Sequence, residues 1–419
     1  MIIRCVAALL ACGGLSTAAV AADHSDAQRE LIALGVEYQA FDVPTSHGVA
    51  HVHVVTVDLR QPGVRAGLLY PGAVSARQPV AQMADAQDAV AAINGDFFDI
   101  SDDQHPGVPA TGSASGPAMM DGIALKAAVP PGQRYGWTPP PGDTAEVIGV
   151  GVDGRARTAA LTLHGHIRTP LGTLPVAGLN QYALPQNSIG VFTPQWGTAS
   201  RARAACGHDD DRSGPCTHNT REVTVHNGLV AEVSDTLMAS SIPSGTLDLV
   251  GRGAGADRLR KLRVGTPVAV AYWLASTSRV PFTFAVGAHR LLRDHRPLPG
   301  LDADQAEPRS AVGIADDGRV LRLVSTDGRE EDSTGLTPQE LAEVLERLHC
   351  DQGVYLDGGG SATLVARDPA TGHDTVRNSV EDGHQRSVPN GIAIYAVPFR
   401  SPDLPLLPPL PPILDSTTR

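Results

Sequence analysis

Three consecutive glycines, residues 358–360, follow a short strand-like run that ends at Asp357. Because glycine has no Cβ atom, the backbone can turn sharply there and other groups can approach it closely. Backbone N–H groups in such a turn can converge on an anion, and the hydroxyls of Ser361 and Thr363 can add hydrogen bonds. A plain turn rarely needs three glycines in succession. We therefore predict a binding site at this turn, with Asp357 at its edge.

Two well-known glycine motifs do not describe this turn. A P-loop needs a lysine after its glycines, and the only lysines of the chain are Lys126 and Lys261. The nucleophile elbow of serine hydrolases ends in a glycine, whereas Thr363 stands at that position. A hydrolase that uses Ser361 with a distant histidine stays open as an alternative, which the failed motif disfavours.

A second segment with polar groups, residues 94–99, reads Asn-Gly-Asp-Phe-Phe-Asp and follows an apolar run. Asn94 and Asp96, separated by Gly95, could bind sugar hydroxyls while the two phenylalanines anchor the loop in the core. A hairpin turn with two core phenylalanines explains the same residues equally well.

Three arginines, Arg309, Arg329 and Arg386, each stand close to a predicted turn. A lone arginine in such a place usually forms a surface salt bridge of little energetic value. Taken together with the glycine turn, the three favour a phosphate or carboxylate site, because the planar guanidinium binds these anions through two parallel hydrogen bonds.

The charge balance excludes some partners. The chain has 419 residues, with 33 Lys+Arg against 45 Asp+Glu and a formal net charge of -12. An acidic chain without a basic run is not expected to bind nucleic acid or an anionic membrane. Hydrophobic residues make up 42% of the chain, enough to build a sizeable core. Beyond the N-terminus no segment is typical of a transmembrane helix, so we expect no stable membrane insertion.

Residues 1–21 are typical of a secretory signal peptide. Arg4 supplies the short charged region, an apolar run follows, and Ala19-Val20-Ala21 offers a cleavage site. A membrane anchor is disfavoured because the apolar run is short and contains glycines. A lipoprotein signal anchored at Cys12 is the minor alternative. We therefore expect a secreted protein.

Export affects the expected pairing of the cysteines, because an oxidising compartment favours disulfides. We predict a local disulfide between Cys206 and Cys216, and expect Cys350 to be left over and buried. A zinc site with His208 and His218 is the alternative, although the spacing fits no standard finger. The aspartates at 209–211 lack the order of an EF-hand loop. No cofactor or metal is predicted, with a structural Ca²⁺ left open.

Hydrophobic patterning indicates a mixed, strand-rich α/β fold with a few packed helices. Asn227-Gly228 predicts a tight hairpin within residues 221–233. Thr337, Pro338 and Glu340 predict the N-cap, first position and capping box of a helix. We expect a single domain over residues 30–397, in which residues 150–275 form a β-rich lobe or insertion. The Pro-rich residues 398–419 are expected to be disordered.

Six motifs, taken in their order along the chain, resemble those of a known family. They are Asn94 to Phe98, Pro308 to Ala311, Asp327 to Arg329, Gly335 to Ala342, Asp357 to Thr363, and Arg386 to Asn390. In this order and composition the chain resembles the phosphodiester glycosidase family. Three residues depart from the family pattern: Asp96 replaces a small residue, Ser310 a threonine and Ala362 a serine.

The resemblance implies hydrolysis of the sugar–phosphate bond of a glycosyl-1-phosphodiester in a cell-surface or extracellular glycan. It implies that Asp357 and Asp327 supply the catalytic carboxylates and that Arg309 assists them. The implied substrate-binding residues are Asn94, Gly95, Asp96, Arg329, Gly358, Gly359, Gly360, Ser361, Thr363, Arg386 and Asn390. The alternative is a non-catalytic cell-wall or glycan-binding module that keeps the same fold.

Overall fold

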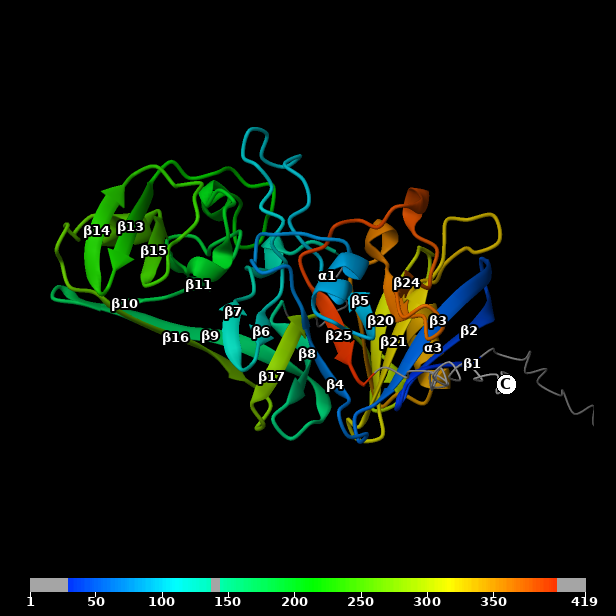
Figure 1. The fold of residues 1–419 in the computed structure, drawn as a ribbon. Helices are drawn as coiled ribbons and strands as arrows, with labels where there is room; N and C mark the ends of the chain where they lie inside the picture. Colours follow the sequence, from blue (N-terminus) through cyan, green and yellow to red (C-terminus); the bar gives the residue numbers. More distant parts are fainter. Residues whose placement is uncertain (1–28, 137–143, 398–419) are drawn as a thin grey trace, which may run out of the picture.

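The computed structural model describes residues 29–136 and 144–397. The predicted signal peptide and Pro-rich tail therefore lie outside the described residues. Figure 1 shows a strand-rich body and a separate lobe, with the long strands β9 (Ala156–Thr169) and β16 (Ala269–Ser276) running along the lobe. These two strands pair antiparallel from Leu161 to Arg168 of β9.

An eight-stranded antiparallel sheet forms one layer of the body. Its order is β1 (Arg29–Ala33), β2 (Val36–Thr45), β3 (Gly48–Asp58), β21 (Val320–Thr326), β20 (Ser310–Ala315), β22 (Gln352–Tyr355), β18 (His289–Arg293) and β19 (Arg296–Pro297). Helix α3 (Pro338–Arg347) packs against β18, β19 and β22 through its apolar face. Leu341, Val344 and Leu345 are buried on that face, because residues three or four positions apart lie on the same side of a helix.

A five-stranded antiparallel sheet forms the second layer. Its order is β24 (Asp374–Val376), β23 (Leu364–Arg367), β5 (Ala91–Asn94), β25 (Gly391–Tyr395) and β4 (Arg65–Leu69), and helix α1 (Val80–Ala86) lies against it. Val55 and Leu323 of the first sheet share one buried cluster with Ile93 and Ile392 of the second. The two sheets therefore pack face to face around the main core.

Two further sheets complete the described chain. A seven-stranded sheet contains β10 (Gly172–Pro175), β9, β8 (Glu146–Gly151), β17 (Phe282–Gly287), β6 (Ala118–Met120) and β7 (Ile123–Lys126), with β16 on β9. The lobe has the order β11 (Gly178–Leu179), β12 (Ile189–Phe192), β15 (Thr246–Arg252), β13 (Thr220–His226) and β14 (Leu229–Ser234), with helix α2 (Ala254–Leu259) beside it. Short 3₁₀ turns span Pro131–Gln133, Pro194–Trp196, Ala202–Ala205, Gly359–Ser361 and Glu381–Gly383.

The predicted strand-rich character is confirmed, but the fold is mostly β rather than an even mixture of helix and strand. Among the strand pairs of the described residues, only β11 and β12 run parallel. Antiparallel pairing suits a fold with few helices. Antiparallel neighbours can be joined by a tight turn, whereas parallel neighbours need a long crossover, usually a helix.

Three local predictions are confirmed. Asn227 and Gly228 both have positive φ, 48° and 78°, and join β13 to β14. Thr337 caps α3, and its side chain and that of Glu340 form the reciprocal capping box. Cys206 and Cys216 form the disulfide, and Cys350 is free and buried.

Candidate active site

The register of the strands explains why the predicted residues meet. In the first sheet Ser310 pairs with Ser325 and Ala311 with Tyr355. The start of β20 therefore lies beside the ends of β21 and β22, which places Arg309, Asp327 and Asp357 at one edge. In the second sheet Gly391 pairs with Asn94, so Asn390 and Asn94 lie at an edge as well.

Asn94 joins the two sheets at this edge. Its side chain is fully buried, and its Nδ2 donates to the carbonyl of Asp357 at 2.7 Å. Its Oδ1 accepts from Ser310 Oγ at 2.6 Å and from the amide of Thr363 at 3.1 Å. With its amide group bonded to three protein groups, Asn94 positions Asp357 and does not face a sugar, in contrast to the interpretation from sequence.

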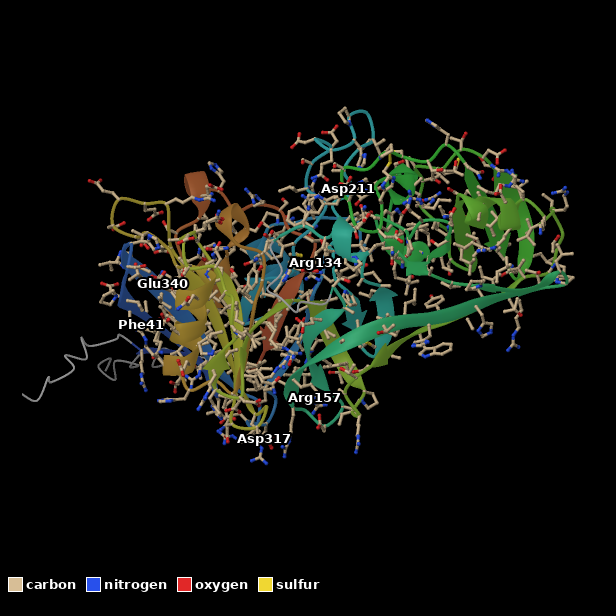
Figure 2. All side chains as sticks on the ribbon, turned by 180° about the vertical axis from the view of Figure 1, so that it is seen from behind. Phe41, Arg134, Arg157, Asp211, Asp317 and Glu340 are labelled. Atoms are coloured by element: carbon tan, nitrogen blue, oxygen red, sulfur yellow. A yellow bond between two sulfur atoms is a disulfide. The ribbon has the colours of Figure 1, made fainter. Side chains whose placement is uncertain are left out.

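Asp96 is also turned into the protein. Its carboxylate pairs with Arg134 Nη2 at 2.9 Å and accepts from the amides of Phe97 and Gly116, and both partner side chains of the ion pair are buried. Its own amide donates to Asn390 Oδ1 at 3.1 Å. Arg134 lies near the centre of the molecule (Figure 2). The bonds of Asp96 and Asn390 therefore hold the loop that begins at Asn94 in place within the protein. These buried groups do not form the expected sugar contacts.

At Gly95 and in the glycine turn, the absence of a Cβ atom lets neighbouring groups of the protein approach the backbone closely. A Cβ on Gly95 would overlap the side chain and backbone of Asn390, and one on Gly358 would come within 2.8 Å of the carbonyl oxygen of Pro308. Gly359 has a positive φ of 56°, which favours glycine.

Three amides of the glycine turn are used within the protein. The amides of Gly359, Ser361 and Ala362 donate to the backbone carbonyls of Pro308, Gly358 and Gly359. Because these donors are engaged within the protein, they are not directed at an anion. The turn instead leaves room for side chains.

All three predicted arginines reach this turn. The guanidinium of Arg309 lies beside Gly358, that of Arg329 beside Gly359, and that of Arg386 beside Gly360. Arg386 Nη1 also donates to Ser361 Oγ at 3.4 Å. Residues that are distant in the sequence thus form one cationic cluster over the three glycines.

Arg309 is the most constrained of the three. Its Nε donates to the carbonyl of Leu336 at 3.1 Å and its Nη2 to that of Gln305 at 2.8 Å. Burial lowers the pKa of its guanidinium, opposed by the charge of Glu307. Arg309 therefore holds the loops together as well as supplying charge beside Gly358.

Two glutamates that sequence reasoning missed bridge the arginines. Glu307 Oε2 lies 3.9 Å from Arg309 Nη1 and 3.5 Å from Arg329 Nη2. Glu381 Oε1 lies 2.6 Å from Arg329 Nη1, and its Oε2 lies 3.5 Å from Arg386 Nη2. Glu307 directly precedes the Pro-Arg-Ser-Ala motif, but no local pattern indicates that Glu381 would reach the same cluster.

Asp357 has the most altered acidity at the site. Burial raises the pKa of its carboxyl to about 7, although a hydrogen bond from Ser361 and the charge of Arg386 oppose the shift. Its amide donates to the carbonyl of Gly95 at 2.8 Å. A carboxyl with a pKa near neutrality can exchange a proton under physiological conditions.

Asp327 has a separate set of partners. Its Oδ1 accepts from the amide of Ser379 at 2.6 Å, and its Oδ2 lies 3.1 Å from His53 Nε2. His53 Nδ1 lies 2.8 Å from the hydroxyl of Tyr38. When Nε2 carries the proton, His53 donates to Asp327 and accepts from Tyr38, which orients the Asp327 carboxylate.

His51 and His53 lie two residues apart on β3 and therefore share a face of the strand, but each has its own acidic partner. His51 Nδ1 lies 2.6 Å from Asp42 Oδ1, and this hydrogen bond raises the pKa of His51. The alternation of the strand was the only signal for His53, and it could not identify Asp327 as its partner.

One group among the described residues has three side chains close enough to bind a metal ion: His105, Cys206 and Cys216. The two cysteines are joined by the disulfide. Neither His208 nor His218, considered from sequence, belongs to this group.

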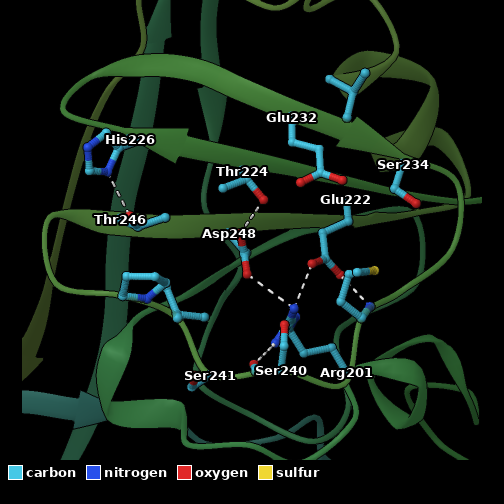
Figure 3. Close-up of a pocket in the computed structure, with 14 residues that line it drawn as sticks. Arg201, Glu222, Thr224, His226, Glu232, Ser234, Ser240, Ser241, Thr246 and Asp248 are labelled. Carbon is cyan, nitrogen blue, oxygen red and sulfur yellow. Dashed lines mark hydrogen bonds and ion pairs between the residues drawn. The ribbon is translucent and has the colours of Figure 1, made fainter.

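A pocket of about 260 Å³ lies elsewhere, in the lobe (Figure 3). It is lined by side chains of β13, β14 and β15, and buried Arg201 bridges Glu222 at 2.7 Å and Asp248 at 3.2 Å. None of the predicted site residues lines it. The arginine cluster is the candidate active site, because the titratable groups that can perform chemistry converge there.

Comparison with known proteins identifies a family for part of the chain. A family model described as phosphodiester glycosidase matches residues 219–395. The resemblance to the phosphodiester glycosidase family is confirmed for this region. The matched region contains Arg309, Asp327, Arg329, Asp357 and Arg386, whereas the segment at Asn94 lies outside it.

Among curated proteins, the SPbeta prophage-derived uncharacterized protein YomE of Bacillus subtilis is 25% identical over 126 residues, which is 29% of this chain and 18% of YomE. Among solved structures, a hypothetical protein from Synechocystis has a TM-score of 0.66 at 22% identity, covering 90% of this chain and 65% of that one. A putative exported protein from Burkholderia pseudomallei has a TM-score of 0.62 at 22% identity, covering 83% and 74%. These two structures show the fold alone.

Within the described residues, no helix has both the length and the apolar character to cross a membrane.

Proposed function

We propose that the protein is a secreted glycosidase that hydrolyses the sugar–phosphate bond of a glycosyl-1-phosphodiester. The observation that carries the proposal is the convergence of Arg309, Arg329 and Arg386 on the glycine turn next to Asp357. Guanidinium groups neutralise charge on a departing phosphate. The match of residues 219–395 to the phosphodiester glycosidase family supports the same reaction class, and the disulfide is typical of exported proteins.

In the proposed reaction the bond between the anomeric carbon and the phosphate oxygen breaks. Asp357 donates its proton to that oxygen, and the arginines stabilise the phosphate monoester that leaves. Water adds to the anomeric carbon, and its proton passes to Asp327, whose carboxylate is held by His53 and Ser379. Two carboxyl groups with different environments are the usual requirement of glycoside hydrolysis.

The test is release of phosphate monoester from a panel of glycosyl-1-phosphodiesters, including teichoic-acid-like polymers. We expect Asp357→Asn to lower the rate by a factor of about 100 or more, because general acid catalysis contributes that much. Asp317→Asn is the matched control, since exposed Asp317 lies in the turn at the other end of β20 and β21 (Figure 2).

Full activity of Asp357→Asn would contradict the assignment. Binding of the polymer by the wild-type protein without any release of product would favour a non-catalytic glycan-binding module instead. Labelling of Ser361 by a fluorophosphonate would favour a serine hydrolase.

A further inference from the structure

Glu381 places a carboxylate directly over the glycine turn. A Cβ atom added to Gly360 would overlap both Glu381 Oε2 and Arg386 Nη2. The same carboxylate bridges Arg329 and Arg386 through its two oxygens, at 2.6 and 3.5 Å. One anionic group thus contacts two of the three arginines and lies against the turn at which we locate the phosphate.

This arrangement is not a buried structural ion pair. The side chains of Glu381, Arg329 and Arg386 remain 34%, 48% and 39% exposed. Exposed ion pairs of this kind contribute little to stability. Arg329 also adopts a positive φ of 59°, a conformation that costs energy for a residue other than glycine. The contact between Glu381 and the two arginines therefore adds little to the stability of the fold.

We propose that the Glu381 carboxylate occupies the position of the substrate phosphate and must leave Arg329 and Arg386 before an anion can bind. The inference rests on the proposed function for the identity of the natural anion. A carboxylate offers one negative charge and two acceptor oxygens, whereas a phosphate group offers more acceptors in a geometry that guanidinium groups bind well. Glu381 therefore lowers the affinity for weaker anions and makes the site select phosphate groups.

Glu307 has a different position in the cluster. It pairs with Arg309 and Arg329 at 3.9 and 3.5 Å but does not contact Arg386. Arg309 is also bonded to two backbone carbonyls. Glu307 therefore pairs with an arginine whose position is fixed by the backbone. Displacement of Glu381 alone frees Nη2 of Arg386, whose Nη1 keeps its contact with Ser361 Oγ, and frees Nη1 of Arg329.

The test is calorimetric titration of the full-length protein with inorganic phosphate at low ionic strength. We expect Glu381→Gln to lower the dissociation constant about tenfold, because two guanidinium groups lose a competing charge. Glu381→Ala should lower it at least as much. Glu343→Gln is the matched control: it removes the same charge from an exposed glutamate that pairs with Arg347 at 3.9 Å on α3, and should change the constant less than twofold.

An unchanged or weaker affinity in both Glu381 variants, with thermal melting showing that they are folded, would overturn the inference. Absence of phosphate binding to all the proteins at millimolar concentration would overturn it too. Tighter phosphate binding without cleavage of any diester would support the inference and reject the proposed function. A third outcome is cleavage that is lost in Asp357→Asn, with phosphate affinity and KM unchanged in the Glu381 variants. That outcome would support the proposed function and overturn the inference about Glu381.

Discussion

At the scale of single residues, acidity is decided by surroundings that the sequence does not display. Asp357 and Asp327 both follow a strand and both precede a glycine. Burial raises the pKa of Asp357 to about 7, whereas the carboxylate of Asp327 is fixed by His53 and the amide of Ser379. Two similar positions in the sequence therefore have different surroundings, and the different roles that we propose for them rest on this difference.

The acidity of Asp357 predicts a pH dependence of stability. A carboxyl whose pKa is higher in the folded protein than in the unfolded chain favours folding when it is protonated. Its contribution is complete below the unfolded pKa of about 3.9 and is lost as pH rises to about 7. We expect the loss to be on the order of 2 kcal/mol, since the residue keeps some contact with solvent.

The measurement compares urea unfolding of the wild type and Asp357→Asn at several pH values between 4 and 7, values set by the two pKa limits. The difference in free energy of unfolding should move in favour of the variant as pH rises, because asparagine does not ionise. A difference that does not change with pH would show that Asp357 titrates normally.

At the scale of elements, the site depends on how β5, β20 and β22 are held together. Asn94 at the end of β5 bonds the backbone after β22, the first residue of β20, and the amide of Thr363 before β23. Local spacing predicted a polar loop at Asn94 but could not show that its partners are more than 200 residues away.

Replacement of Asn94 by alanine should therefore affect stability and activity together. Buried groups left without hydrogen-bond partners typically cost about 1–3 kcal/mol each, so we expect Asn94→Ala to lower the free energy of unfolding by about 3 kcal/mol. Substrate cleavage should fall as well, because Asp357 loses its anchor. Urea unfolding and phosphodiester cleavage check this; an unaffected stability would contradict the bridging role.

At the scale of the whole molecule, the loop closed by Cys206 and Cys216 connects distant parts of the chain. Within it, Arg212 donates to the carbonyl of Arg134 at 2.8 Å, and Arg134 pairs with Asp96 in the interior of the body. Asp211 of the same loop lies above Arg134 in Figure 2. The disulfide thus stabilises a loop that contacts Arg134, the partner of Asp96, and not the arginine cluster of the candidate site.

Removal of the disulfide should lower stability more than activity. The cysteines are 10 residues apart, and closing a short loop typically contributes about 2–3 kcal/mol. We expect a double Cys206→Ser, Cys216→Ser variant to lose that much free energy of unfolding while cleaving substrate at close to the wild-type rate below its melting temperature. Loss of activity in the folded variant would instead place the loop within the catalytic machinery.

The sequence by itself determined what depends on neighbouring residues. The turn at Asn227-Gly228, the capping box of Thr337 and Glu340, and the short-range disulfide all follow from chemistry acting over a few positions. The motif order also pointed to Arg309, Asp327 and Asp357, because each stands next to a strand-like run, and to Arg386 shortly before Asn390.

Only the tertiary structure decided which polar groups face the site. Asn94 and Asp96 are drawn inward by partners on other strands, three amides of the glycine turn are bonded within the protein, and Glu381 lies over the arginines. The physical reason is that strand register brings together residues hundreds of positions apart. A polar side chain satisfies its hydrogen bonds with whatever that register places beside it.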